Sequence, residues 1–223
     1  MFKGHYDNWI ISRMNGIKKY ISTDYFKSKT LLELGCGHAH IGNEFYKLGS
    51  IVSSSDARKE HINTVNNIYP HIETLLIDCE NDDILKKYDI ILHWGLLYHL
   101  NEIEIHLKTV SERCDLLLLE SEVCDSNDDT FYIKINENNN YFDQAFNSIG
   151  IRPSQTYVEK ILKNNGFQYE LIKDPILNSG IHIYDWDIQN TKKFQHGLRR
   201  FWICWKNIES PLIALNNDNL IVT

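Results

Sequence analysis

The sequence is poor in cysteine, has no excess of basic residues and contains no long apolar run. Its five cysteines are odd in number and show no Cys-x-x-Cys spacing, which argues against a disulfide framework and favours reduced thiols in the cytoplasm. The net charge of −7 argues against a protein that coats nucleic acid through bulk electrostatics, although it leaves room for a local basic groove. No apolar run approaches the roughly 18 residues of a membrane span, and the N-terminal stretch MFKGHYDNWI lacks a signal-peptide core, so we expect no membrane partner.

The residues that are present suit one globular unit. A chain of 223 residues with 43% hydrophobic content can bury one sizeable core. No internal repeat, flexible linker or domain boundary is visible, so the sequence predicts a single domain over 1–223 that begins with a helix over 5–22. Two irregular stretches, 121–151 and 174–198, interrupt the pattern. Irregular segments of this length inside a compact domain are usually functional, and we expect these two to cover a bound substrate.

Short apolar runs alternate with helical segments through the first half of the chain. Strands are expected at 31–34, 51–55, 74–77, 88–93 and 115–119, and helices at 38–48, 59–68 and 103–113, with a short helical turn near 82–86. Further along, a helix over 154–164 and strands over 131–135, 167–172 and 199–206 are expected, with a small hairpin around 216–219. The first strands are apolar throughout, which is typical of a parallel sheet covered on both faces. The fold class is therefore α/β, with a doubly wound, mostly parallel sheet.

Acidic residues stand at the ends of three consecutive expected strands. The run LLELGCG ends an apolar strand with Glu33 and breaks into a turn at Gly35 and Gly37, where the backbone can approach a ligand closely. Asp56 closes the next apolar run, and Asp78 closes the one after it. Because parallel strands end at the same edge of a sheet, these carboxylates are placed to bind a ribose and an adenine. The plainer alternative is that the two aspartates are ordinary helix caps.

These motifs resemble class I S-adenosylmethionine-dependent methyltransferases over roughly residues 5–206. The matching pieces are ELGCG, the aspartates after the second and third strands, and HWGLLYHL after the fourth. The resemblance implies a Rossmann-like sheet of seven strands and S-adenosyl-L-methionine as cofactor. It places the methionine part over the glycine turn, with Glu33 near its ammonium group, the ribose on Asp56 and the adenine amino group on Asp78. The cofactor site would comprise Tyr6, Arg13, Glu33, Gly35, Cys36, Gly37, Asp56, Ala57, Asp78, Cys79, His93 and Trp94.

A closer similarity is to the catalytic domain of the tRNA wobble-uridine carboxymethyl transferases. It is carried by the run GLLYH at 95–99, by a strand that ends in Leu119-Glu120 before an acidic loop, and by a Pro-Ser-initiated helix that ends in Gly166-Phe167. The resemblance implies that RNA is a second partner to consider beside a small-molecule acceptor.

The acceptor side should be built from residues after the fourth and fifth strands. Methyl transfer from a sulfonium mainly needs the acceptor to be aligned and, where necessary, deprotonated. His99 is the leading candidate for the general base because imidazole titrates near neutral pH, and a purely structural histidine is the alternative. Tyr98 is expected to line the pocket and Glu120 to orient the acceptor, with core packing and a solvated strand end as the plainer interpretations. A basic group could receive a phosphate or carboxylate: Arg152, Lys192, Lys193, His196, Arg199 and Arg200.

We therefore expect a methyltransferase that acts on oxygen or nitrogen of a small molecule or biosynthetic intermediate. The alternatives are a tRNA base methyl or carboxymethyl transferase, and a methyltransferase fold that serves as a non-catalytic binding subunit. A nicotinamide site is disfavoured because position 40 of the glycine turn is His rather than Gly. A calcium loop from Asp125 fails because Thr130 stands at its sixth position and Asn136 at its twelfth, so no metal is expected.

Overall fold

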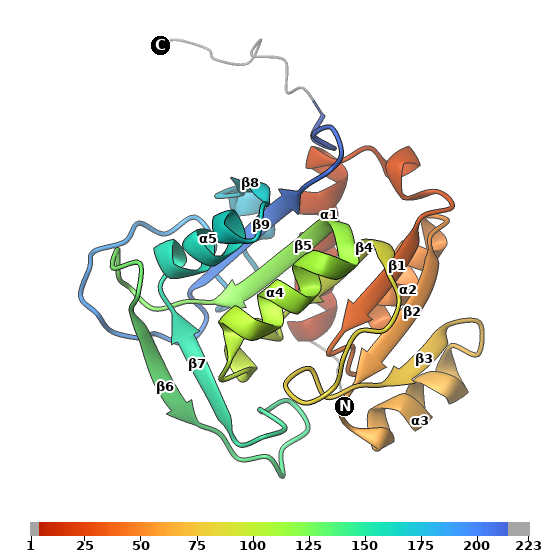
Figure 1. Ribbon diagram of the computed structural model, residues 1–223, viewed down its shortest axis with the longest axis horizontal. Coiled ribbons are helices and arrows are strands. Elements are labelled where there is room, and N and C mark those ends of the chain that lie inside the picture. The colour runs from red at the N-terminus through yellow and green to blue at the C-terminus, as the bar shows by residue number, and fades with distance from the viewer. Residues whose placement is uncertain (1–4, 214–223) are drawn as a thin grey trace.

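Seven strands form one sheet in the computed structural model, which describes residues 5–213. They are β1 (Thr30–Leu34), β2 (Ile51–Asp56), β3 (Glu73–Leu76), β4 (Tyr88–Trp94), β5 (Cys114–Glu122), β8 (Gln168–Leu171) and β9 (Arg199–Trp205). Their order across the sheet is β3-β2-β1-β4-β5-β9-β8 (Figure 1). The first five in that order run parallel, and β9 is antiparallel to both β5 and β8. The expected doubly wound, mostly parallel sheet of seven strands is confirmed.

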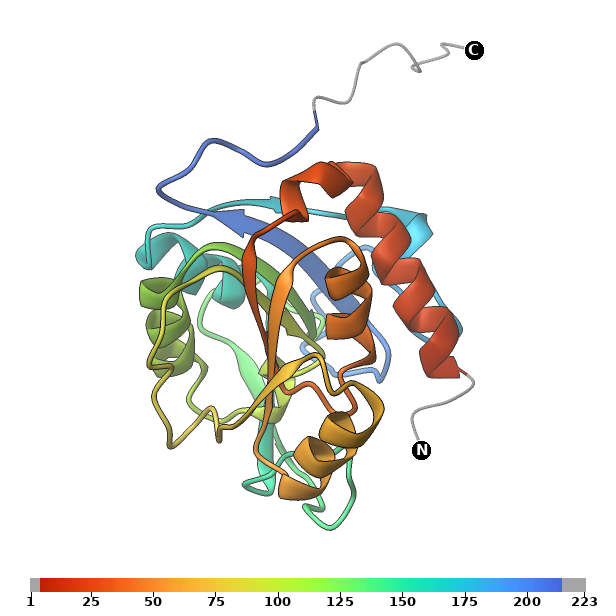
Figure 2. The same ribbon diagram turned by 90° about the vertical axis from the view of Figure 1, so that its right-hand side faces the viewer.

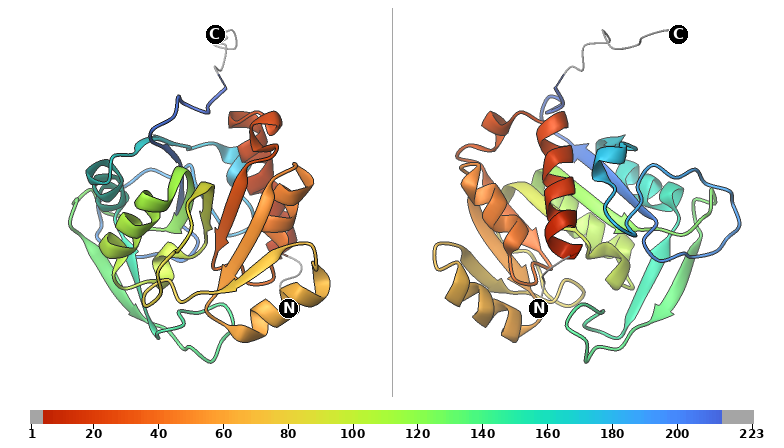
Figure 3. Two further views of the ribbon diagram at one scale, coloured as in Figure 1. Left: turned by 45° about the vertical axis from the view of Figure 1, so that its right-hand side comes forward. Right: turned by 180° about the vertical axis from the view of Figure 1, so that it is seen from behind.

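Helices cover both faces of this sheet. They are α1 (His5–Tyr20), α2 (His40–Lys47), α3 (Lys59–Ile68), α4 (Ile103–Arg113) and α5 (Gln155–Asn164), with short 3-10 turns η1 (Thr23–Phe26), η2 (Leu97–His99) and η3 (Pro175–Leu177). Seen edge-on, α1 and α2 lie on one side of the sheet and α4 and α5 on the other (Figure 2). From behind, α1 crosses the face of the sheet (Figure 3).

The strand residues alternate between two apolar cores. Leu31 and Leu116 point into the core shared with α1, α2 and α3, whereas Leu32 and Leu117 point into the core shared with α4 and α5. All four are fully buried. Burial on both faces explains why these strands are apolar throughout instead of alternating with polar residues.

Two sequence-based expectations were wrong. No helical turn forms over 82–86; a turn lies at 79–81 instead, and the chain then runs irregularly to β4. The stretch 121–151 is not a loop with one short strand, because β6 (Tyr132–Asn136) pairs antiparallel with β7 (Ile149–Pro153). This hairpin extends from the carboxyl edge of the sheet (Figure 1). The hairpin expected around 216–219 lies outside the described residues.

Helix α5 begins as its sequence predicts. The Ser154 hydroxyl accepts a hydrogen bond from the backbone N–H of Tyr157, which is an N-terminal cap. None of the helices within residues 5–213 combines the length and the apolar character that crossing a bilayer requires.

Candidate active site

A cleft of about 690 Å³ opens at the carboxyl edge of the parallel strands. Most of the residues expected from the sequence line it: Tyr6, Arg13, Gly35, Cys36, Gly37, Asp56, Ala57, Asp78, Cys79, Trp94, Tyr98 and His99. Three others do not reach its wall and lie buried behind it: Glu33, His93 and Glu120. The structure therefore brings the two halves of the expected site, the cofactor residues and the acceptor residues, into one cavity.

The glycine turn after β1 forms one end of the cleft. Gly35 has φ 62°, a left-handed conformation that favours glycine, and a Cβ there would lie 2.9 Å from the Leu96 side chain. The backbone N–H of Gly37 donates to Asp56 Oδ2 at 2.9 Å. The turn is thus held against the end of β2 by a carboxylate.

Asp56 sits at the junction of the turn and α3. Besides Gly37, the backbone N–H of Arg58 donates to Oδ1 at 2.9 Å, and His61 Nδ1 lies 3.1 Å from the same oxygen. Since a carboxylate offers about four lone-pair sites, these contacts leave acceptor capacity for hydroxyl groups in the cleft. Asp56 does not cap α3 with its side chain, because the N-cap position is Arg58.

Glu33 on β1 joins the start of α2 to β2, behind the wall of the cleft. Its Oε1 accepts from the backbone N–H of Gly42 at 3.1 Å, and its Oε2 accepts from the Ser54 hydroxyl at 2.7 Å. Burial raises the pKa of Glu33 to about 7, against the opposing effect of these hydrogen bonds and of Arg13. A Cβ at Gly42 would come within 2.4 Å of Oε2, so a glycine at this point of α2 makes room for the carboxylate.

A buried histidine pair lies behind the wall at Cys79. The Nε2 atoms of His93 and His106 are 2.8 Å apart, and His106 Nδ1 lies 3.2 Å from the backbone oxygen of Cys79. A carbonyl oxygen only accepts, so His106 carries its proton on Nδ1 and His93 donates from Nε2. Burial lowers the pKa of His106 to about 4 and that of His93 well below its usual range, with the charge of His106 adding to the shift at His93. The pair is therefore neutral at physiological pH.

Asp78 and Glu80 form the far rim of the same end of the cleft. The side-chain amide of Asn147 donates to both Asp78 oxygens at 3.2 and 3.3 Å and to Glu80 Oε2 at 2.9 Å. Arg58 holds the same segment by donating to the backbone oxygens of Asn139 at 2.9 Å and Gln144 at 3.0 Å.

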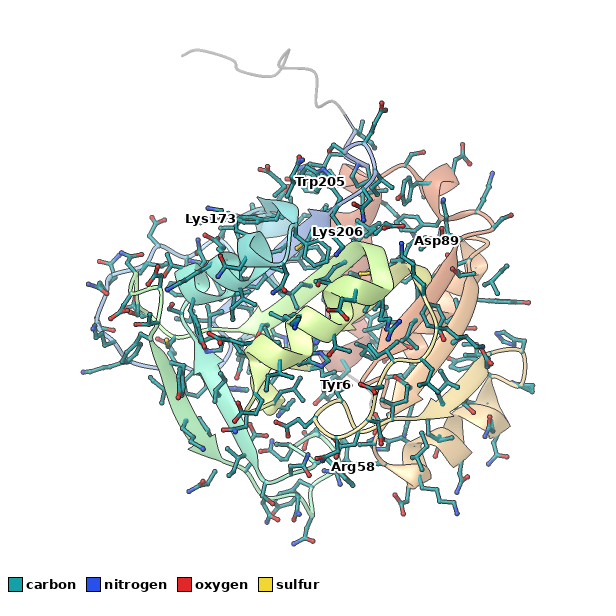
Figure 4. All side chains as sticks on the ribbon, in the orientation of Figure 1. Tyr6, Arg58, Asp89, Lys173, Trp205 and Lys206 are labelled. Atoms are coloured by element: carbon teal, nitrogen blue, oxygen red, sulfur yellow. The ribbon has the colours of Figure 1, made fainter. Side chains whose placement is uncertain are left out.

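The segment between β6 and β7 is therefore fastened to the end of the cleft that Asp78 and Glu80 form. Tyr6 on α1 also reaches it, since its hydroxyl donates to Asp143 Oδ2 at 3.4 Å. Figure 4 shows Tyr6 and Arg58, which contact this segment from α1 and from the start of α3.

The opposite end of the cleft is built on buried charge. Arg199 Nη1 donates to Glu120 Oε1 at 2.9 Å, Arg13 Nη1 lies 3.5 Å from Glu120 Oε2, and the Tyr184 hydroxyl donates to Glu120 Oε1 at 3.3 Å. Arg199 Nη2 also donates to the Tyr98 hydroxyl at 3.2 Å. Glu120 thus holds two arginines that line the cleft and does not itself line it.

Aromatic rings flank these guanidinium groups. Arg13 lies 3.7 Å and Arg199 4.5 Å from the ring centroid of Trp9, and Arg199 lies 4.8 Å from that of Tyr98. Such stacking adds to the ion pairs. Trp9 itself is buried and donates from Nε1 to the Tyr184 hydroxyl at 2.6 Å, which agrees with a packing role for this part of α1.

A second arginine centre lies beside the first. Arg152 Nε donates to Glu122 Oε2 at 2.9 Å, and its Nη1 donates to Glu137 Oε1 at 2.9 Å and to the Tyr98 backbone oxygen at 2.8 Å. Three other basic residues of the group expected to bind an anion also have partners: Lys192 with Asp128, His196 with Glu122, and Arg200 with the backbone oxygens of Tyr184 and Trp186.

His99 is paired with a carboxylate. Its Nδ1 lies 2.5 Å from Glu137 Oε2, and the same oxygen accepts from the backbone N–H of Ala145 at 2.7 Å. Burial would raise the pKa of Glu137, but the hydrogen bond and charge of His99, with Ala145 and Arg152, lower it to about 2. Glu137 is therefore a carboxylate at neutral pH and only accepts, so His99 keeps its proton on Nδ1 and Nε2 is the basic nitrogen.

Sequence reasoning missed several of these residues. Glu137, Asn147 and Tyr184 each belong to one of the two stretches that were read as irregular, and no motif or spacing marks them. Within residues 5–213, no group of three or more His, Cys, Asp or Glu side chains is arranged to hold a metal ion.

Comparison with known proteins identifies the fold. No protein-family model matches the chain. The N-terminal domain of EvdMO1, solved with S-adenosylhomocysteine bound, superposes with a TM-score of 0.67 at 16% identity, over 90% of this chain and 81% of that one. An S-adenosylmethionine-dependent methyltransferase from Mesorhizobium loti superposes with a TM-score of 0.60 at 10% identity, over 81% and 92% of the two chains. The chain therefore has the fold of the class I S-adenosylmethionine-dependent methyltransferases.

Sequence similarity to curated proteins covers shorter segments. The ubiquinone biosynthesis O-methyltransferase of Pelagibacter ubique is 29% identical over 113 residues, which is 45% of this chain and 47% of that protein. The chain spans less than half the length of the curated relatives that it matches, 27% in one case and 47% in the other.

Proposed function

We propose that the protein transfers a methyl group from S-adenosyl-L-methionine to an oxygen or nitrogen of a small molecule. One observation carries this proposal: a single cleft joins the glycine turn and aspartates at one end to His99, with its basic Nε2, at the other. The shared fold and the similarity to an O-methyltransferase support it.

The cofactor end is proposed to bind through backbone and carboxylates. Gly35, Cys36 and Gly37 would face the methionine part, Asp56 would accept from the ribose hydroxyls, and Asp78 from the adenine amino group. A charge-assisted hydrogen bond of this kind contributes about 1.5–3 kcal/mol. Glu33, which joins α2 to β2 behind the cleft, would lie near the cofactor's ammonium group. Bound S-adenosylmethionine would supply a methyl carbon activated by its sulfonium.

The acceptor end is proposed to align and deprotonate the substrate. His99 Nε2 would take the proton from the acceptor hydroxyl or amine, while Tyr98 would bound the acceptor. The acceptor cover would come from both stretches that were read as irregular, 121–151 and 174–198. Phe142 of the first and Ile181, His182 and Phe194 of the second line the cleft, which supports this role.

On this proposal the chain is one methyltransferase domain that works in a reducing compartment such as the cytoplasm, which its five unpaired cysteines favour.

The charge balance of the acceptor end favours an uncharged acceptor. Three arginines and three glutamates face one another there: Arg13, Arg152 and Arg199 with Glu120, Glu122 and Glu137. No surplus of fixed positive charge remains among them to bind a phosphate chain. The tRNA acceptor that the GLLYH run suggests is therefore the second candidate. An affinity for RNA that falls steeply as the salt concentration rises would support it.

Incubation with a methyl-labelled donor and a metabolite extract tests the proposal. Mass spectrometry should find a small molecule that gains one labelled methyl group, and RNA from the same extract should stay unlabelled. His99→Asn should lower the rate by about 10²–10⁴, the usual worth of a general base, and leave S-adenosylhomocysteine affinity unchanged. Labelling of RNA alone would overturn the small-molecule assignment, and saturable cofactor binding without any labelled product would favour a binding subunit.

A further inference from the structure

Glu137 is a buried acid next to the cleft that no sequence motif marks. Its side chain is 1% exposed, and three donors meet its two oxygens: His99 and Ala145 on Oε2, and Arg152 on Oε1. A buried carboxylate needs such compensation because its desolvation is costly. Two of its partners, His99 and Arg152, line the cleft, so the carboxylate lies directly behind the wall that faces the acceptor.

The hairpin of β6 and β7 delivers this carboxylate to its place. Glu137 follows β6 directly, and its backbone N–H donates to the Ser148 oxygen at 2.8 Å, which extends the pairing of the two strands. Gly150 on β7 lets the hairpin approach η2, since a Cβ there would lie 2.3 Å from the Tyr98 oxygen and 2.7 Å from Glu137 Oε1. Arg152, two residues on, clamps the same Tyr98 oxygen. Strand β7 is therefore fitted to the residue pair Tyr98–His99.

We infer that Glu137 is a positioning residue that holds His99 in the tautomer and orientation required of a general base. The inference rests on the proposed function, because it gives Glu137 a role through the proton acceptor of that reaction. The carboxylate fixes the proton of His99 on Nδ1 and so directs the lone pair of Nε2 away from the hairpin. Across residues 5–213, no group hydrogen-bonds Nε2 of His99, so this nitrogen stays available to a substrate.

The charge of Glu137 also stabilises the imidazolium that forms when His99 takes a proton. Arg152 does not cancel this stabilisation, because its guanidinium is shared with Glu122, to which its Nε donates at 2.9 Å. The depressed pKa of Glu137, about 2, keeps the carboxylate ionised throughout the range in which imidazole titrates. A group of this kind orients and supports a base without itself receiving the proton.

Nitrogen-15 NMR of histidine-labelled protein saturated with S-adenosylhomocysteine tests the positioning directly. The wild-type protein should show His99 as the Nδ1-protonated tautomer. Glu137→Gln should convert it to a mixture of tautomers, because the amide can accept at one atom and donate at the other. An unchanged tautomer in the variant would overturn the inference. This readout needs no acceptor, so it stands even if the proposed methyl transfer fails.

A double-mutant cycle provides the second test. It compares the kinetics of the wild type, His99→Asn, Glu137→Gln and the double variant. With the acceptor found by labelling, Glu137→Gln should lower kcat by about 10- to 100-fold, a part of what a general base supplies, and leave KM little changed. The double variant should be no slower than His99→Asn alone, because residues that act as a unit are non-additive. The acid limb of the pH–rate profile should also move to lower pH in Glu137→Gln.

The controls separate positioning from folding. Glu104→Gln makes the same substitution at an exposed carboxylate that accepts from the Tyr157 hydroxyl on the far side of α4, and it should leave all readouts unchanged. Glu137→Asp keeps the charge and should recover part of the lost rate. Multiplicative losses in the cycle, with an unshifted pH profile, would overturn the inference and leave the methyltransferase proposal intact. Transfer that is normal in His99→Asn would instead refute the proposed base.

Discussion

The two ends of the cleft hold their ligand-facing groups by different means. At the cofactor end, Asp56 at the end of β2 accepts from the backbone N–H groups of Gly37 in the turn and of Arg58 at the start of α3. At the acceptor end, side-chain charges drawn from α1, β5, the β6–β7 hairpin and β9 fix one another. The first arrangement needs only two neighbouring parallel strands and the segments that follow them. The second needs the whole fold to be complete before any of its charges is compensated.

Two buried glutamates make the contrast concrete. Glu33 at the cofactor end has neutral donors on its oxygens, and burial raises its pKa to about 7. Glu137 at the acceptor end is buried too, but His99 and Arg152 lower its pKa to about 2. Glu137 therefore stays ionised at a pH at which Glu33 is half protonated, because Arg152 is a cation whereas both hydrogen-bond donors of Glu33 are neutral.

The largest effect should come from removing one charge of the acceptor end. Arg199→Met leaves Glu120 buried with only Arg13 opposite it, so we expect the free energy of unfolding to fall by about 3–5 kcal/mol. Lys87→Met is the matched control, since its pair with Asp115 is exposed and such pairs contribute about 0–1 kcal/mol. Urea denaturation measures both. Equal, small losses would show that the arginine–glutamate network is not structurally important.

A second difference should appear in the pH dependence of stability. The folded-state pKa of Glu33, about 7, exceeds its ordinary value of 4.5, so its contribution is fully present below pH 4.5 and is lost as pH rises to 7. The free energy of unfolding of wild type relative to Glu33→Gln should therefore fall by up to about 3 kcal/mol between these pH values. Glu137→Gln should show the opposite trend, because that carboxylate stabilises the fold above its unfolded pKa. Parallel stability curves for wild type and Glu33→Gln would contradict the assignment.

Asp56→Ala should weaken the cofactor end alone. Losing charge-assisted hydrogen bonds to the ribose is worth about 1.5–3 kcal/mol, so calorimetry should find S-adenosylhomocysteine bound about ten- to a hundredfold more weakly. Asp56→Asn keeps an acceptor for the Gly37 N–H and should lose less affinity. An unchanged dissociation constant in Asp56→Ala would remove this residue from the cofactor site.

The smallest expected effects come from adding a methyl group to one glycine at each end of the cleft, which should affect cofactor binding and methyl transfer separately. Gly42→Ala crowds Glu33 Oε2 at 2.4 Å, whereas Gly150→Ala crowds the Tyr98 oxygen at 2.3 Å. Each should cost about 1–3 kcal/mol of stability through overpacking. We expect the first to weaken S-adenosylhomocysteine binding and the second to slow transfer with binding retained. Losses of the same kind in both variants would show that the two ends are not independent.

The gathering of the glycine turn, Asp56 and Asp78 at one edge of the sheet could be predicted from the sequence, because each follows its own apolar run. Asp56 and Asp78 directly follow apolar runs, and parallel strands bring such positions to one edge whatever the rest of the chain does. The glycine turn likewise depends on conformations available to few other residues. The parallel sheet could also be predicted from these apolar runs, because its strands are buried against a core on each face.

The acceptor end could not be predicted because its contacts join distant segments. Glu137 lies 38 positions from His99, and although a strand was predicted just before it, the strand that pairs with it, β7, was not. Strand β7 reads IGIRP, whose glycine and proline argue against a strand in sequence terms. Glycine is needed there for close approach to η2, and proline stands at the strand's end. Arg152 and Arg199 suggested an anion site because nothing in the sequence marks their buried glutamate partners.

The most direct test of the account is a crystal structure with S-adenosylhomocysteine bound. The account predicts that the ribose hydroxyls lie within hydrogen-bonding distance of Asp56, the adenine lies beside Asp78, and the sulfur points toward the chamber bounded by Tyr98 and His99. An adenosyl group bound elsewhere, or a cleft that stays closed to the ligand at saturating concentration, would contradict it.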